Sequence, residues 1–94
     1  MAILHGTAWD SMARAAKTLD AMRGNPRDWR IEQLETIAAA FGVRCRKPGG
    51  SHVIFEHPAV IEALSVPARR PIKPIYVTRF VRLIDAVRGS NDPS

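Results

Sequence analysis

The stretch that decides the fold of this chain is Val43-Arg-Cys-Arg-Lys-Pro-Gly-Gly-Ser-His-Val-Ile-Phe-Glu56. Apolar and polar residues alternate on both sides of a Pro-Gly-Gly turn, and such alternation is typical of paired strands with one buried face. We therefore expect a β-hairpin whose returning strand covers residues 51–56. One face of the hairpin is apolar, and the other carries cations and a histidine.

The register of this hairpin depends on the length of its loop. We expect a three-residue loop over residues 48–50, because a loop of even length would place arginines beside Val53 and Phe55, where their charge would be desolvated. The same register predicts that Cys45 is a buried apolar residue. The expected cross-strand pairs are Lys47 with Ser51, Arg46 with His52, Cys45 with Val53, and Val43 with Phe55.

Two amphipathic helices are expected before the hairpin. Apolar residues recur at helical spacing over residues 7–23, and Gly24 follows as a terminator. A second apolar stripe begins near Asp28 and stops at Gly42, since glycine readily takes the left-handed conformation that ends helices. The aromatic residues on the helical stripes are interpreted as core residues rather than base-stacking platforms. They are Trp9, Trp29, Tyr76 and Phe80.

After the hairpin we expect a third strand, a basic loop and a last helix. The strand covers about residues 63–66, and the loop over 68–73 is stiffened by proline. Ile75-Tyr-Val could also form a strand, but apolar residues continue at helical spacing over several turns and favour a helix that ends at Gly89. Residues 89–94 are expected to be a disordered tail.

This element order predicts an α+β fold in a single domain, residues 1–94. A small three-stranded antiparallel sheet carries helices on one face, and its other face stays exposed to water. The core, about residues 28–88, has the α-β-β-β-α order that is also found in double-stranded-RNA-binding domains, and the helix over 7–23 is an addition to it. We expect functional residues on the exposed face.

Composition favours a nucleic-acid partner. Lys and Arg number 14 against 9 Asp and Glu, so the formal net charge is +5, although such a charge can also serve solubility alone. A single cysteine, Cys45, cannot form an internal disulfide, and with so few candidate ligands we expect neither a structural zinc site nor a cofactor. The chain lacks a recognisable signal peptide or membrane span, and we expect a cytoplasmic protein.

His52 is the candidate catalytic residue. It follows a glycine-rich turn at the start of a strand, and an imidazole can deprotonate a ribose 2′-hydroxyl near neutral pH. Neighbouring cations could stabilise negative charge at phosphorus or hold the RNA backbone. The alternative is an ordinary exposed histidine in a hairpin. The residues expected to bind RNA are Arg44, Arg46, Lys47, Ser51, Arg69, Arg70 and Lys73.

From about Trp29 to Val87 the chain resembles the HicA toxins of bacterial toxin-antitoxin pairs. The resemblance is carried by the Gly50-Ser-His52 element, the following Leu64-Ser-Val-Pro67 segment and the Lys73-Pro74 pair before the last helix. It implies a fold like that of double-stranded-RNA-binding domains and a metal-independent mRNA interferase that cleaves through His52. It also implies a HicB-like antitoxin that covers this surface.

The chain departs from the family pattern at one position that bears on mechanism. Many HicA toxins carry a second histidine just after the Val-Pro of the third strand, where this chain has Ala68-Arg69-Arg70. A mechanism with two histidines is therefore not expected. Two other readings stay open, a non-catalytic RNA-binding domain and an interaction protein whose basic face docks on an acidic partner.

Overall fold

The computed structural model describes residues 3–90, with side chains from Asp10 onward, and confirms the α+β class. The predicted tail residues 91–94 lie outside the described part of the chain. Three strands form one antiparallel sheet in the order β1-β2-β3. The elements are α1 (Ile3–Gly24), α2 (Ile31–Ala40), β1 (Arg44–Arg46), β2 (His52–Glu56), β3 (Leu64–Pro67) and α3 (Pro74–Ser90).

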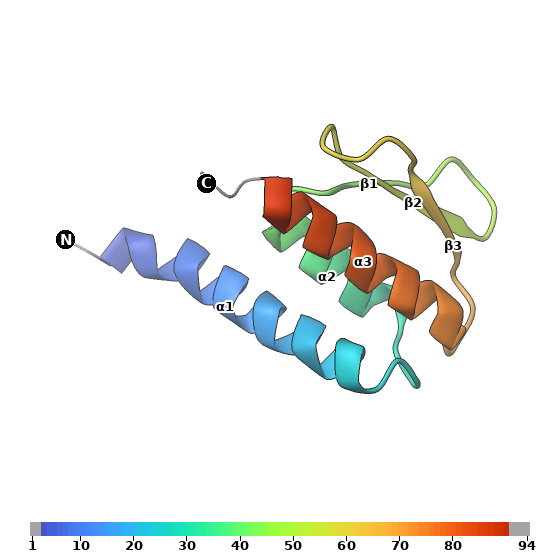
Figure 1. The fold of residues 1–94 in the computed structure, drawn as a ribbon, viewed down its shortest axis with the longest axis horizontal. Helices are drawn as coiled ribbons and strands as arrows, with labels where there is room; N and C mark the ends of the chain where they lie inside the picture. The colour runs from blue at the N-terminus through green and yellow to red at the C-terminus, as the bar shows by residue number, and fades with distance from the viewer. Residues whose placement is uncertain (1–2, 91–94) are drawn as a thin grey trace.

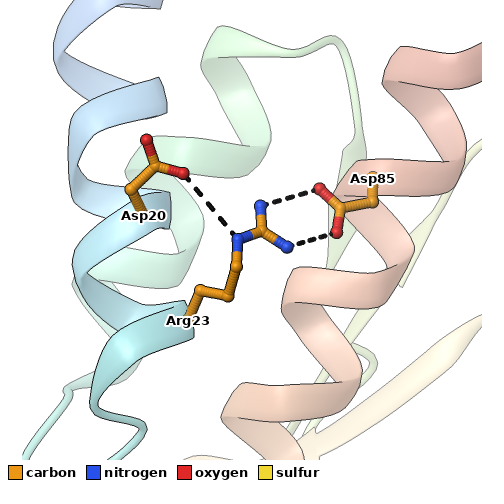
Figure 2. A network of polar contacts seen from close by, with 3 residues as sticks. All are labelled: Asp20, Arg23 and Asp85. Carbon is orange, nitrogen blue, oxygen red and sulfur yellow. Dashed lines mark hydrogen bonds and ion pairs between the residues drawn. The ribbon is translucent and has the colours of Figure 1, made fainter.

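The elements are stacked in three layers (Figure 1), with α2 and α3 between the sheet and α1. The N-terminal helix α1 packs on both α2 and α3 and therefore forms an additional outer layer. An ion pair between Arg23 of α1 and Asp85 of α3 joins these two helices (Figure 2). All helices therefore lie on one side of the sheet, as the sequence predicts.

The hydrophobic core is one continuous cluster that runs from the sheet to α1. Val53 and Phe55 of β2 are buried, whereas His52 is exposed, which is the alternation expected of a sheet with one covered face. The rings of Phe55 and Phe80 meet edge to face, with centroids 5.0 Å apart, and connect the sheet to α3. Leu19 and Met22 extend the cluster into α1.

The hairpin register differs from the expected one. Arg46 lies opposite Ile54 and Cys45 opposite Phe55, so the register is shifted by two residues and the connection spans residues 47–51. Each strand keeps its faces because the shift is even. The prediction that Arg46 faces His52 is nevertheless wrong.

Two features account for the longer connection. Gly49 and Gly50 both have positive φ, 115° and 82°, which glycine allows at low cost. The observed register also places Glu56 beside Arg44 and Arg46, with its Oε2 3.1 Å from Nε of Arg46 and 3.7 Å from Nε of Arg44. An arginine on each side of one carboxylate favours this pairing over the expected one.

Cys45 is exposed, which corrects the prediction of a buried residue. It lies in the edge strand β1, which has a neighbouring strand on one side only. Partial desolvation is the main cause that raises the pKa of its thiol, and the negative charge of Glu35 raises this pKa further. The thiol form is therefore favoured over the nucleophilic thiolate.

Helix boundaries also differ from those predicted. Helix α1 begins at Ile3 rather than residue 7, and α2 begins at Ile31 because Asp28 has a left-handed φ of 66°. The predicted terminator Gly42 is confirmed with a φ of 73°, and the Val43 amide donates to the Ala38 carbonyl oxygen at 2.8 Å, as in a Schellman motif. At the other end of the chain, helix α3 continues to Ser90, so residues 89 and 90 are helical rather than part of a tail.

Candidate nucleic-acid interface

His52 lies at the end of the sheet nearest the start of α3. It is the first residue of β2, it is exposed, and it pairs with Pro67 at the last position of β3. The backbone continues this pairing for one more bond, in which the Ala68 amide donates to the Ser51 carbonyl oxygen at 2.7 Å. The histidine therefore has a firmly held backbone and an accessible side chain, as the sequence predicts.

The basic loop over residues 68–73 is held against the helical layer near its C-terminal end. Ile72 is fully buried, and its amide donates to the Trp29 carbonyl oxygen at 2.9 Å. Arg70 turns toward α2, where its Nη2 lies 3.5 Å from Oε2 of Glu32. This anchoring leaves Arg69 and Lys73 exposed on the side of the loop that faces His52.

These segments enclose an open hollow of about 300 Å³. It is lined by Ser51, His52, Pro67, Arg69, Lys73 and Tyr76. Within the described residues neither Arg69 nor Lys73 forms an ion pair with a carboxylate, so both cations remain available to an anionic ligand. The hollow thus combines an imidazole, two hydroxyls and two free cations, which suit the binding of a phosphodiester and proton transfer to and from its oxygens.

The remaining predicted RNA-binding residues lie elsewhere and are paired with carboxylates. Arg44 and Arg46 share Glu56, and Lys47 Nζ lies 3.1 Å from Oε2 of Glu35. The hydrogen bond from Lys47 to Glu35, with the attraction between their charges, raises the pKa of Lys47. Arg46 and Lys47 therefore belong to the β1 side of the sheet and do not face His52.

Tyr76 is a lining residue that sequence reasoning missed. Its place on the apolar stripe of the last helix led to its assignment to the core, and the structure shows it half-buried, packed against the core at one side and lining the hollow at another. One signal could have found it. Tyr76 is the third residue of α3, close to the basic loop in the sequence. A polar aromatic residue at that position can contact the same ligand as the loop.

The other candidate histidines have different settings. The Nδ1 atom of His57 accepts a hydrogen bond from the Ala59 amide at 3.0 Å, which stabilises the turn after β2. His57 also lines a separate hollow with Arg44 and Glu56, at the other end of β2. His5 lies in the part of α1 whose side chains are not described. Of the two histidines whose side chains are described, His52 is the one placed next to unpaired cations.

In the described part of the chain no three His, Cys, Asp or Glu side chains are grouped closely enough to hold a metal ion. The described helices include none with the length and apolar character needed to cross a membrane. Comparisons of the chain with models of protein families, with curated proteins and with solved structures gave no match.

Proposed function

We propose that this protein is a metal-independent endoribonuclease of the HicA toxin type, which cleaves mRNA with His52 as its catalytic residue. The observation that carries the proposal is the hollow in which His52 stands with Arg69 and Lys73. Two cations without carboxylate partners, beside an exposed imidazole, suit a phosphodiester better than an uncharged ligand. The resemblance of the Gly-Ser-His, Val-Pro and Lys-Pro segments to HicA toxins supports the same activity.

In the proposed reaction His52 is the general base. It takes the proton of a ribose 2′-hydroxyl, and the oxygen attacks the adjacent phosphorus while the bond to the 5′-oxygen breaks. The products are a 2′,3′-cyclic phosphate and a new 5′-hydroxyl end. Negative charge increases on the phosphoryl oxygens in the transition state, and Arg69 and Lys73 stabilise it.

The other basic residues have a supporting role in this proposal. Arg44, Arg46 and Lys47 along β1, with Arg70 beside α2, attract the RNA backbone at a distance from the cleavage point, although carboxylates weaken their charge. The proposed partner in the cytoplasm is a HicB-like antitoxin that covers the hollow and prevents RNA from reaching His52.

The test is cleavage of a long single-stranded RNA in the presence of a chelator. Wild-type protein is expected to cut it and to leave 2′,3′-cyclic phosphate ends, and His52→Ala is expected to lower the rate by roughly 10²-fold or more while RNA binding persists. His57→Ala is the matched control, because His57 lies at the opposite end of the same strand and serves a turn. This variant should cut at the wild-type rate.

Two outcomes would contradict the proposal. If the wild-type protein binds the RNA and leaves it intact, the chain is a non-catalytic RNA-binding module. If His52→Ala cuts as fast as the wild type, the catalytic residue is misassigned. In cells, expression should arrest growth, and the same substitution should relieve the arrest; harmless expression of the wild type favours a docking protein instead.

A further inference from the structure

A second proton-bearing side chain lines the His52 hollow at the start of α3. Tyr76, in the first turn of the helix, is one of the lining residues. We propose that its phenolic hydroxyl is the general acid of the cleavage reaction, giving its proton to the departing 5′-oxygen. This inference rests on the proposed ribonuclease function and adds to it the second residue that acts in proton transfer.

The departing 5′-oxygen must gain a proton, and a positioned acid supplies it faster than water does. When His52 takes the proton of the 2′-hydroxyl, the 5′-oxygen leaves as an alkoxide, which is strongly basic unless a proton arrives as the bond breaks. The histidine that many HicA toxins carry after the Val-Pro segment is replaced here by Ala68-Arg69-Arg70. Arginine does not release its proton in proteins, so Arg69 cannot take over that role.

Tyr76 and Lys73 remain as candidates, because phenols and ammonium groups carry a proton at neutral pH and are much stronger acids than the aliphatic hydroxyl of Ser51. Lys73 is exposed, and its ammonium group lies at the end of a long flexible side chain, which suits the neutralisation of phosphate charge. Tyr76 is half-buried, and its ring packs against the core. Proton transfer benefits from a group held in place, and this favours the tyrosine.

Two further contacts involve Tyr76, one at its ring and one at its backbone. The guanidinium carbon of Arg79, one turn along α3, lies 5.8 Å from the ring centroid, and the Tyr76 amide donates to the Lys73 carbonyl oxygen at 2.9 Å. Within the described residues the hydroxyl has no protein hydrogen-bond partner, and it is not a buried unsatisfied group. The hydroxyl is therefore free to donate to a ligand.

After donation the charges balance. His52 holds the proton of the 2′-hydroxyl, Tyr76 is a phenolate, and the leaving oxygen is a neutral 5′-hydroxyl. Return of the proton from the imidazolium to the phenolate, through water, restores both side chains.

The experiment compares two substrates, an oligonucleotide with one ribonucleotide linkage and the same oligonucleotide with sulfur in place of the bridging 5′-oxygen. A thiolate is a much weaker base than an alkoxide and leaves without a proton. Tyr76→Phe, which removes only the hydroxyl, is expected to lower kcat on the oxygen substrate by roughly 10²-fold or more, with little change in KM. On the sulfur substrate the variant should cleave at nearly the wild-type rate.

Lys73→Gln is the matched comparison, and thermal melting checks that both variants fold. A residue that only binds phosphate affects both substrates equally, so Lys73→Gln should slow them by the same factor. The proposal is overturned if Tyr76→Phe cuts the oxygen substrate at the wild-type rate, if it slows both substrates equally, or if sulfur rescues Lys73→Gln instead. Wild-type protein that cuts neither substrate overturns the ribonuclease function itself, whereas activity that needs His52 but not the Tyr76 hydroxyl overturns this proposal alone.

Discussion

The attachment of α1 to α3 by Arg23 and Asp85 can be measured with a double-mutant cycle. The guanidinium donates two hydrogen bonds to the carboxylate, from Nη1 to Oδ2 at 2.6 Å and from Nη2 to Oδ1 at 3.0 Å, while Asp20 lies 3.8 Å from Nε (Figure 2). The cycle uses Arg23→Gln, Asp85→Asn and the double variant. These substitutions remove charge and keep side-chain size, so each tests the pair without creating a cavity.

The structure sets the expected size of the coupling. The two side chains are 46% and 41% exposed, so solvent screens much of their attraction. Exposed pairs contribute about 0–1 kcal/mol, and paired hydrogen bonds to one carboxylate place this pair at the upper end. We therefore expect a small favourable coupling energy at neutral pH and low salt. The total stability of such a domain is only about 5–15 kcal/mol, so the effect is measurable.

The pH dependence of the coupling has a definite sign. The hydrogen bonds from Arg23, opposed in part by desolvation, lower the pKa of Asp85 below its ordinary value of 3.8. A carboxyl group whose pKa is lower in the folded state stabilises the fold above its unfolded pKa and loses that contribution as the pH falls through the folded pKa. The coupling should thus be complete at neutral pH and decline below the ordinary value. The opposite shift, a raised pKa of Arg23, has the same cause and acts only at strongly alkaline pH.

Urea unfolding of the four proteins, at neutral pH and at successive acidic values, gives the coupling energy from the midpoints. Added salt should reduce it, because exposed charges are screened. A coupling of zero within error at neutral pH and low salt would refute the argument that the pair joins α1 to α3. A coupling that stays constant into acid would refute its electrostatic origin.

Two further predictions concern the core and the β1 side of the sheet. Phe80→Ala removes the ring that meets Phe55 and should lower the free energy of unfolding by about 3–5 kcal/mol in urea titrations; a loss below about 1 kcal/mol would contradict the buried contact. Glu56→Gln removes the carboxylate between Arg44 and Arg46, so binding to single-stranded RNA should tighten, and the slope of log affinity against log salt should steepen by about 0.7 per freed cation. Unchanged binding would place both arginines outside the RNA contact.

The alternation along the hairpin was enough to predict which residues lie on each face of the sheet. Side chains in a strand repeat with a period of two, so buried Val53 and Phe55 necessarily leave His52 on the exposed side. Helical spacing likewise predicted the three helices, and Gly42 predicted the end of α2, because these signals are local. The same signals could not set the hairpin register, since shifts by two residues keep the same faces.

The neighbours of His52 were decided by tertiary structure. The sequence placed Arg46 and Lys47 beside it, but ion pairs with Glu56 and Glu35 hold these residues along β1 and against α2. Such pairings depend on which strand positions and helices meet. A pattern within one segment of the sequence cannot predict these pairings.

The residues that do surround His52 come from the loop after β3 and the first turn of α3. Arg69 and Lys73 were recognised as basic residues, and Tyr76 was assigned to the core, because composition and spacing describe each segment separately. Burial of Ile72 and its backbone hydrogen bond to Trp29 position that loop next to the strand ends. The sequence alone thus determined an exposed histidine on a basic sheet, and the packing of the loop and α3 determined its partners, because residues distant in the chain converge only when the core forms.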